Sequence, residues 1–507
     1  MGPARSLASA PASAVAVVAA VPVAVVVLGL AASLAAAEGN MVLQVHHRFR
    51  GRRHMLGAMR SHDAFRHGRL LSPVDLPLGG KGSPTDTGLY FAKIGIGTPS
   101  RDYYVQVDTG SDILWVNCIG CDQCPKKSDL GVELTLYDPN GSSTADPITC
   151  DQERCISTYN AAFPGCKPDV LCPFYVSYGD GSTTAGYFVE DNVQLDQVTG
   201  NLQASSMNSS VIFGCAAKQS GGLGTSSEAL DGILGFGQAN SSMLSQLASS
   251  GKVKKVFAHC LDNTNGGGIF AIGEVVQPEV NTTALVPNQA YYNVVMKAVE
   301  VGGDVIELPT DIFGFGGENE AIIDSGTTLA YLPGDIYNPL IEKIMAQQPG
   351  LERHTVEEQF SCFQFVGSVD NGFPVVKFHF DGSLALAVYP HDYLFQYRDD
   401  TWCVGFMSAE MQSEDGKDIT LLGDLVFSNK LVLYDLENQT IGWADYNCSS
   451  HITVKDEKSG ATYSVGAHHI VSNSAHHIGS NSELVSLRIS AVLLLLAAVL
   501  YNFMLYA

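Results

Sequence analysis

One short pattern occurs twice in this chain and restricts its fold more than any other feature. Asp-Thr-Gly-Ser at 108–111 and Asp-Ser-Gly-Thr at 324–327 each follow an apolar stretch, and two apolar residues and a glycine come later, at 233–235 and 421–423. Around both copies apolar and polar residues alternate, with Gly and Pro between them, as in short strands joined by tight turns. The repeat predicts an all-β, bilobal fold of two similar β lobes.

The composition agrees with this prediction. The 507 residues include 51 Gly and 21 Pro, which imply many turns, and 46% of them are hydrophobic, which is enough for large cores. We expect an N-terminal lobe over 88–285 and a C-terminal lobe over 286–448. The net charge of −23 would repel phosphate, so no nucleic-acid partner is expected.

A third Asp-Thr-Gly, at 86–88, shows how little the triplet means by itself. Asp caps its own backbone and Gly supplies positive φ, so most such triplets are ordinary turns. This copy follows Gly-Ser-Pro-Thr at 82–85 instead of an apolar strand, and Leu89 stands where the other copies have a hydroxyl residue. We interpret it as a linker turn.

Asp108 and Asp324 can form a chemically useful pair. Burying one ionised carboxylate is costly, whereas two carboxyls can share a proton, because like charges a few ångströms apart cannot both ionise. The ionised member can take a proton from a water that attacks a carbonyl. The protonated member polarises that carbonyl and later helps the amine to leave. Which Asp carries the proton stays open, because the pair titrates as a unit.

These motifs resemble the pepsin family of aspartic proteases, and within it the atypical, nepenthesin-like plant branch. The two Asp turns match the active-site turns of that family, and Trp115 matches the Trp that follows the first turn. Tyr178-Gly179-Asp180 resembles the tip of the flap, the hairpin that closes over the substrate. The resemblance covers about residues 88–448.

The resemblance implies an aspartic endopeptidase with its active site between the lobes and with Asp108 and Asp324 as catalytic residues. It implies protein or peptide substrates, a monomer, and no cofactor or metal. Tyr178, Gly179, Asp180 and Trp115 would contact the substrate. The residues that support the two turns would be Thr109, Gly110, Ser111, Ser325, Gly326 and Thr327. A catalytically silent pepsin-like inhibitor or binding protein is the alternative, because the fold does not guarantee the activity.

All 12 cysteines lie between Cys118 and Cys448. Disulfides explain them better than a zinc site does, because no second pair of ligands at zinc spacing follows the three cysteines at 118–124. The Cys-rich insertion 118–172 resembles that of nepenthesin-like enzymes. By analogy with the family, we expect the disulfides Cys362–Cys403 and Cys215–Cys448.

The N-terminal residues predict export. Residues 1–37 have a basic start, a long apolar stretch and Ala-Ala-Ala at 35–37, as in a secretory signal peptide, with an uncleaved anchor as the alternative. Residues 38–70 carry seven Arg against two carboxylates. By the resemblance, the basic stretch 38–72 would be a prosegment that inhibits the acidic body within the same chain.

The C-terminal residues predict a lipid anchor. A polar linker at 449–473 precedes small residues, a polar spacer and an apolar tail, which together are typical of a GPI-attachment propeptide at 474–507. Asn473 is the expected attachment site, with 479–481 as an alternative, and a tail packed on the body remains possible. We expect the outer face of the plasma membrane, or alternatively the apoplast.

Six Asn-x-Ser/Thr sequons are typical of an exported chain. They lie at Asn140, Asn208, Asn240, Asn281, Asn438 and Asn447. The last is doubtful because Cys448 is its middle residue.

Overall fold

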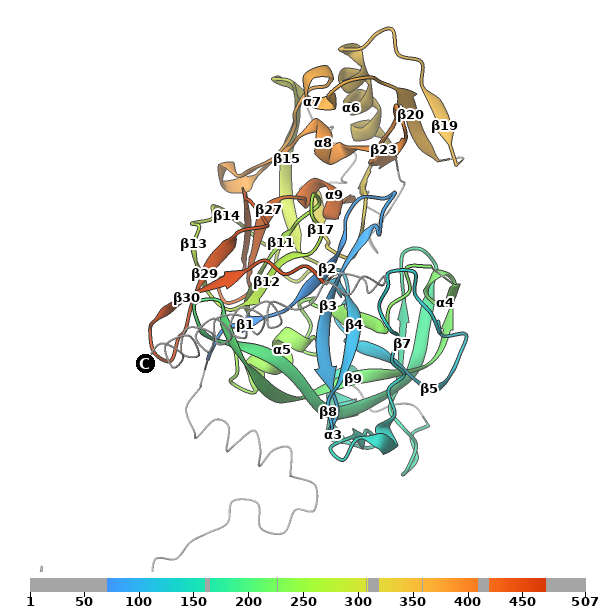
Figure 1. Cartoon of the computed structure of the whole chain (residues 1–507), viewed down its shortest axis with the longest axis vertical. Helices are drawn as coiled ribbons and strands as arrows, with labels where there is room; N and C mark the ends of the chain where they lie inside the picture. The colour runs from blue at the N-terminus through green and yellow to red at the C-terminus, as the bar shows by residue number, and fades with distance from the viewer. Residues whose placement is uncertain are drawn as a thin grey trace, which may run out of the picture. The chain divides into compact units, whose positions relative to one another are not determined.

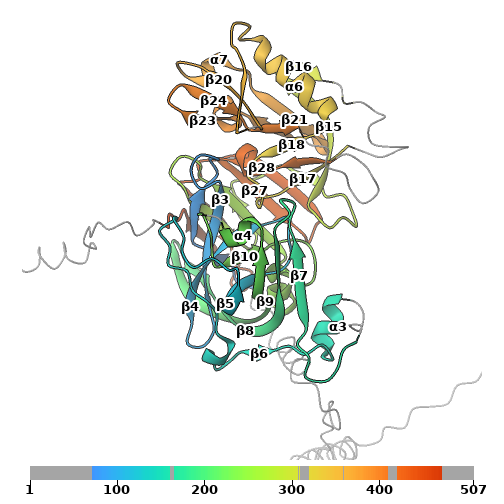
Figure 2. The ribbon, with the colours of Figure 1, turned by 90° about the vertical axis from the view of Figure 1, so that its right-hand side faces the viewer.

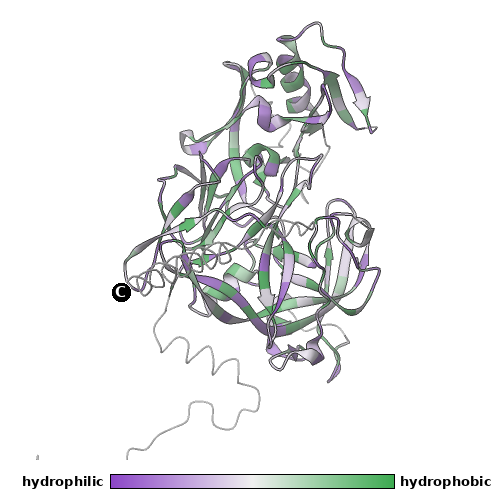
Figure 3. Cartoon of the chain, viewed as in Figure 1, coloured by the Kyte–Doolittle hydropathy of each residue, from purple (hydrophilic) through white to green (hydrophobic). Residues whose placement is uncertain are grey.

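A computed structural model describes residues 71–159, 165–225, 227–306, 308, 319–357, 359–408 and 419–470. These residues are mostly strands, arranged in two lobes (Figures 1 and 2). In Figure 3 apolar and hydrophilic residues alternate along many of the strands, as the sequence pattern predicts. The structure therefore confirms the all-β, bilobal fold.

The N-terminal lobe is built on one large sheet. Its strands pair in the order β2-β3-β4-β10-β5-β9-β8-β1-β12-β11. Its strands are β1 (Val74–Asp75), β2 (Leu78–Lys81), β3 (Leu89–Ile96), β4 (Arg101–Asp108), β5 (Trp115–Asp122), β6 (Asp146–Pro147), β7 (Pro173–Ser177), β8 (Thr183–Gly200), β9 (Gln203–Ser220), β10 (Gly232–Gly235), β11 (Val256–Leu261) and β12 (Gly268–Ile272). Its helices are η2 (Pro139–Gly141), α3 (Glu153–Tyr159), α4 (Gly222–Thr225) and α5 (Met243–Ser249).

The C-terminal lobe contains an eight-stranded and a four-stranded sheet. The eight-stranded sheet consists of β15 (Asn293–Val301), β16 (Asp304–Ile306), β17 (Glu320–Ile323), β18 (Ala330–Leu332), β21 (Val376–Phe380), β22 (Ala385–Val388), β25 (Phe406–Ser408) and β26 (Thr420–Leu422). The four-stranded sheet consists of β19 (His354–Val356), β20 (Phe360–Gln364), β23 (Leu394–Arg398) and β24 (Thr401–Val404). The helices are α6 (Gly334–Ala346), α7 (Val369–Gly372), η3 (Asp381–Ser383), α8 (Pro390–Tyr393) and α9 (Asp424–Phe427).

The lobes share strands. β14 (Thr282–Ala284), β27 (Lys430–Asp435) and β28 (Thr440–Asp445) extend the large sheet, because β27 pairs with β11. Every residue of β11 is buried, as expected for a strand that is covered on both faces.

The polar linker predicted for 449–473 is wrong for most of its length. β29 (His451–Lys455) and β30 (Thr462–Gly466) form a hairpin that pairs with β13 (Val275–Gln277). Ile452, Val454 and Val465 bury their side chains in a cluster that also contains Cys448. Alternate positions of the hairpin are therefore apolar and packed, a pattern that the polar composition concealed.

All six disulfides join cysteines that lie close together in the sheets or in the insertion. Cys362 and Cys403 face each other across β20 and β24 and are bonded. The predicted Cys215–Cys448 disulfide is wrong. Cys215 on β9 bonds Cys118 on the adjacent β5, and Cys448 bonds Cys260 on β11. The insertion is closed by Cys121–Cys124, Cys150–Cys166 and Cys155–Cys172.

Candidate active site

The first Asp turn begins where β4 ends. β10 lies parallel to β4, with Leu234 opposite Val107 and Gly235 opposite Asp108. The Phe236 N–H donates to the Asp108 carbonyl at 2.7 Å. A Cβ on Gly235 would lie 2.3 Å from the backbone of Asp112, so only glycine allows the strand to pass beneath the turn.

The second turn is built in the same way. β26 lies parallel to β17, with Leu422 opposite Ile323. The Asp324 N–H donates to the Leu422 carbonyl at 3.0 Å. A Cβ on Gly423 would lie 2.2 Å from the Thr327 carbonyl oxygen. The internal repeat read from the sequence is thus a repeat of structure, with an apolar-apolar-Gly strand beneath each Asp.

The two carboxyl groups lie against each other. A Cβ on Gly110 would lie 2.7 Å from both carboxylate oxygens of Asp324, and a Cβ on Gly326 would lie 2.1 Å from Asp108 Oδ1. The charge of Asp324 contributes to the raised pKa of Asp108, as expected for neighbouring carboxyls. Each glycine leaves space for the carboxylate of the opposite lobe.

Each carboxyl is held by its own turn. Asp108 accepts from the Gly110 N–H at 2.8 Å and from Ser111 Oγ at 2.5 Å. Asp324 accepts from the Gly326 N–H and from Thr327 Oγ1, both at 2.7 Å. These matched bonds orient the oxygens of the pair. Each of these turns has a hydroxyl residue that the triplet at Asp86 lacks, and that hydroxyl thus hydrogen-bonds the carboxylate.

One hydrogen bond ties the turns across the lobe interface. The Ser325 N–H donates to Thr109 Oγ1 at 2.8 Å. The resemblance also implied a role for the Ser325 hydroxyl, but that buried oxygen has no partner among the described residues. A second bond across the interface runs from Gln106 Nε2 on β4 to the Gly326 carbonyl at 3.3 Å.

Burial dominates the electrostatics of the pair. Asp108 and Asp324 are 6% and 9% exposed. Desolvation, followed by the Asp324 charge, raises the pKa of Asp108 to about 7. Desolvation also raises the pKa of Asp324, against the bonds from Thr327 and Gly326. One shared proton is what such a pair holds at acid to neutral pH.

Asp424 is a third buried carboxyl that the sequence analysis missed. It directly follows Gly423, and its backbone N–H donates to the Thr327 carbonyl at 2.8 Å. Burial raises its pKa well above the usual range, and the charges of Asp324 and Asp108 add to the rise. Its Oδ1 has no partner within the described part of the chain. The only signal in the sequence was its place after Leu-Leu-Gly.

The flap turn connects β7 to β8. The Tyr178 N–H donates to the Ser182 carbonyl at 2.9 Å. The Tyr178 hydroxyl accepts from Trp115 Nε1 at 2.6 Å. Burial raises the pKa of Tyr178, the charge of Asp108 adds to the rise, and Trp115 and Ser111 oppose it, so the flap tyrosine lies near both Ser111 and Asp108.

The other two predicted flap residues are exposed. Asp180 Oδ1 accepts from the N–H and the hydroxyl of Ser182 at 2.9 and 2.6 Å, so this carboxylate closes the turn. A Cβ on Gly179 would meet no atom within 4 Å, so its side is open to solvent.

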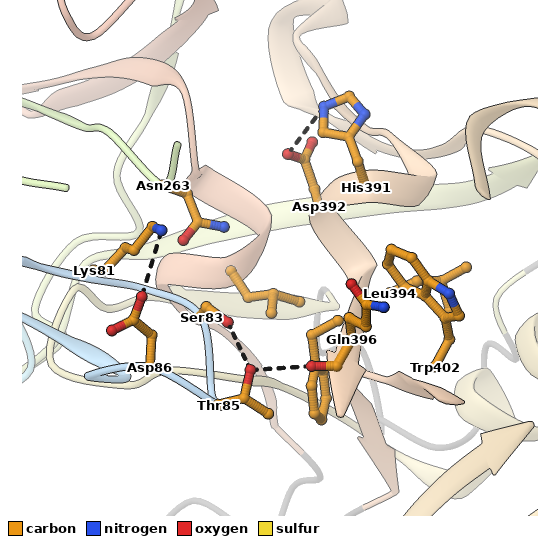
Figure 4. Close-up of a pocket in the computed structure, with 12 residues that line it drawn as sticks. Lys81, Ser83, Thr85, Asp86, Asn263, His391, Asp392, Leu394, Gln396 and Trp402 are labelled. Atoms are coloured by element: carbon orange, nitrogen blue, oxygen red, sulfur yellow. Dashed lines mark hydrogen bonds and ion pairs between the residues drawn. The ribbon is translucent and has the colours of Figure 1, made fainter. Parts of the chain in front are cut away.

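A polar pocket of about 300 Å³ lies where the β2–β3 hairpin meets the C-terminal lobe (Figure 4). Thr85 Oγ1 donates to the Gln396 carbonyl at 3.1 Å, and Lys81 pairs with Asp86 at 3.4 Å. The residues that line it do not include Asp108 or Asp324. The third triplet thus belongs to a contact between the lobes, away from the paired carboxyls.

The fold and the paired carboxyls define a pepsin-like protein. The family models "Xylanase inhibitor N-terminal" and "Xylanase inhibitor C-terminal" match residues 90–274 and 291–445. Aspartic proteinase 36 of Arabidopsis thaliana is 53% identical over 90% of this chain and 93% of its own length. Aspartic proteinase 39 of the same plant is 48% identical over 86% and 90%.

A solved structure agrees in fold. Basic 7S globulin from soybean superimposes with a TM-score of 0.57 at 21% identity, covering 74% of this chain and 96% of its own. From the family models and the Arabidopsis relatives, this chain belongs to the plant aspartic proteinase family of pepsin-like proteins.

The remaining sequence predictions concern the surface and the two ends. All six sequon asparagines are exposed, which leaves them accessible as acceptors. Among the described residues no helix is long and apolar enough to cross a membrane. The predicted signal peptide, nearly all of the prosegment, Asn473 and the GPI propeptide lie outside the described residues.

Proposed function

We propose that this protein is an aspartic-type endopeptidase in which Asp108 and Asp324 together activate a water. The observation that carries the proposal is the pair itself: two buried carboxyls in contact, each held by a hydroxyl from its own turn. The relatives named aspartic proteinases support the same activity.

The mechanism follows from the shared proton. The ionised carboxylate takes a proton from a water between the two groups, and the water oxygen attacks the peptide carbonyl carbon. The protonated carboxyl donates to the carbonyl oxygen, which becomes the hydroxyl of a tetrahedral diol. A proton then passes from a carboxyl to the amide nitrogen, the C–N bond breaks, and the amine and the new carboxylic acid leave.

The substrates we propose are peptides or proteins in an extended conformation under the flap. Tyr178, with its hydroxyl fixed by Trp115, would cover the substrate, and Gly179 and Asp180 at the exposed tip would contact it. Closure of such a flap excludes water from the site. The basic segment 38–72 of the same chain would bind the acidic body and inhibit it until the segment is removed.

We further propose that the enzyme acts at the outer face of the plasma membrane through a GPI lipid. The six sequons and the small-residue, spacer and apolar-tail pattern of the C-terminus support this location. Release from intact cells by a phosphatidylinositol-specific phospholipase tests it, and retention on the cells would refute the anchor.

Acid activation of the full chain, followed by incubation with a diverse peptide pool, tests the activity. We expect cleavage that pepstatin blocks and that Asp108→Asn and Asp324→Asn abolish. Asp86→Asn is the matched control, since Asp86 is exposed and lines a pocket away from the paired carboxyls. Activity should fall as the pH rises through about 7, because both carboxyls are then ionised.

Correctly folded, processed protein that cleaves nothing between about pH 3 and pH 7 would contradict the proposal. That outcome would favour the alternative of a silent inhibitor or binding protein. Thermal unfolding of each Asn variant distinguishes a lost reaction from a lost fold.

A further inference from the structure

The C-terminal end of the described chain returns to its first strands. Residues 467–470, which we call the C-terminal segment, follow the β29–β30 hairpin. His468 exchanges two backbone hydrogen bonds with Gly268 on β12, at 2.7 and 2.8 Å. The Ile470 N–H donates to the Leu78 carbonyl on β2 at 3.0 Å. The backbone of the segment is thus paired with strands of the N-terminal lobe.

One side-chain contact joins this segment to β1. His468 Nε2 lies 2.8 Å from Asp75 Oδ2. The Asp75 side chain is only 13% exposed, and its other oxygen, Oδ1, is buried and has no partner within the described ranges. A half-buried carboxylate costs free energy unless it is paired. The imidazole of His468 is therefore the side chain that holds this carboxylate.

A second carboxylate faces the same place. In the antiparallel pairing of β1 with β8, Asp75 lies directly opposite Asp196. Like charges in directly opposite positions destabilise a sheet. Lys93 on β3 also acts on the charge of Asp196, but its ammonium is bound to Asp102 at 2.8 Å. A protonated His468 thus offsets two carboxylates that would otherwise repel each other.

The proton on His468 decides the strength of this contact. The hydrogen bond with Asp75 raises the pKa of His468 above its ordinary value, partial burial opposes the rise, and the charges of Asp75 and Asp196 add to it. Because the pKa is higher in the folded than in the unfolded chain, the contact contributes fully below about pH 6.5. That contribution is lost as the pH rises through the folded-state pKa.

We propose that His468, Asp75 and Asp196 form a proton-dependent clasp, which holds the C-terminal segment on β1 in acid and loosens it at higher pH. When His468 loses its proton, its hydrogen bond with Asp75 is no longer charge-assisted, and two carboxylates face each other without a cation. The clasp couples the two ends of the body. β1 begins just after the predicted prosegment 38–72, and the C-terminal segment ends just before the predicted attachment site Asn473.

Hydrogen–deuterium exchange of the full chain, corrected for the intrinsic effect of pH, tests the clasp in the peptide that covers 467–470. In the wild type we expect its protection to fall roughly threefold to tenfold between about pH 5 and about pH 8. The buried strand β11 should keep its protection over the same range. A parallel loss in β11 would indicate general unfolding and refute a local clasp.

Three variants assign the effect to particular groups. His468→Gln keeps a hydrogen-bond donor without the charge, so protection of the segment should be low and independent of pH. Asp196→Asn removes the opposing carboxylate and should lose less protection at high pH than the wild type. His469→Gln is the matched control, because the ring of His469 lies beside Gly266, 3.2 Å from the position of a Cβ there. This control should keep the wild-type dependence on pH.

Protection that does not change with pH in the wild type would overturn the proposal. So would an unchanged pH dependence in His468→Gln, or a lost one in His469→Gln, because another group would then be responsible.

Histidine-selective NMR gives a second readout. The resonance that disappears in His468→Gln identifies the imidazole of His468, and Asp75→Asn should lower its pKa. A titration that Asp75→Asn leaves unchanged would refute the clasp. Neither measurement needs catalysis, so an inactive wild-type protein that gives both expected results would refute the proposed peptidase function and leave the clasp intact.

Discussion

The two Asp turns have the same internal structure but different surroundings. Each has a glycine that admits the opposite carboxylate, a hydroxyl on its own Asp and an apolar-apolar-Gly strand beneath. Around them the symmetry ends. Trp115, which follows the first turn on β5, bonds Tyr178 of the flap, whereas the second turn has the buried Asp424 behind it.

This comparison shows that the repeated motif specifies the carboxyl pair, whereas the surroundings of the two turns have different roles. The neighbours of the first turn are neutral hydrogen-bonding groups that connect it to the substrate side and to the other lobe. The neighbour of the second turn is a third carboxyl, Asp424, whose pKa its burial raises. Substitutions at the features that both turns share should therefore have similar effects in either turn. Substitutions at the features that only one turn has should have different effects.

The largest effect is expected where the carboxyls meet. Gly326→Ala would place a methyl group 2.1 Å from Asp108 Oδ1 and separate the pair, so we expect kcat to fall on the order of a hundredfold or more. Gly110→Ala, with 2.7 Å to Asp324, should do the same from the other lobe. Gly350→Ala, whose Cβ would meet no atom within 4 Å, is the control. Peptide hydrolysis measures the change, and activity in Gly326→Ala near that of the control would contradict the contact.

The next effect concerns stability in acid. Burial lowers the pKa of His259 to about 3, below its ordinary value, so the neutral ring stabilises the fold fully above about pH 6.5. That contribution is lost as the pH falls towards 3, in total roughly 4 to 5 kcal/mol.

The raised pKa values of Asp108 and Asp424 act in the opposite direction, because those carboxyls stabilise the fold at low pH. The comparison of wild type with His259→Gln separates the two effects. Calorimetric unfolding at several pH values should show the variant gaining on the wild type as the pH falls. A constant difference between the two proteins would disprove the contribution of His259.

A smaller effect distinguishes the two hydroxyls. Ser111→Ala removes a bond to Asp108 near the flap tyrosine, whereas Thr327→Val removes only a bond to Asp324. We expect kcat to drop roughly tenfold in either variant, since each loses a hydrogen bond to a charged group. KM should rise in Ser111→Ala alone. Equal KM values in the two variants would mean that the proximity of Ser111 to the flap does not contribute to substrate binding.

The smallest effect is expected for the flap hydroxyl. Tyr178→Phe keeps the ring and loses the bond with Trp115, so a change of about threefold in kcat/KM is expected from one neutral hydrogen bond. Steady-state kinetics with one peptide substrate measures it. A loss as large as that of Gly326→Ala would place the Tyr178 hydroxyl among the reacting groups.

Much of the fold and of the pair was readable in the sequence. Local pattern determines strands and turns, and the repeated turns with their apolar approaches implied two lobes and a shared site. The same reasoning separated Asp86 from Asp108 and Asp324, since an apolar strand and a following hydroxyl are features of neighbouring residues. Cys362–Cys403 followed only from family resemblance.

Other features depended on contacts between distant residues. Cys215 bonds Cys118 because β9 lies beside β5, and Cys448 bonds Cys260 because the C-terminal segment returns to β11. The hairpin of β29 and β30 is stable because β13 offers it an edge. A local sequence pattern does not show which residues from distant parts of the chain become neighbours in the folded protein.

The sequence by itself determined the chemistry: two carboxyls, their hydroxyls and the glycines that let them approach are all encoded within a few residues of each Asp. Only the tertiary structure decided what surrounds them, namely Asp424 behind one turn and the flap Tyr178, bonded to Trp115, beside the other. The physical reason is that burial and long-range pairing, which set the pKa values and the direction of these hydrogen bonds, arise only when the two lobes share a sheet.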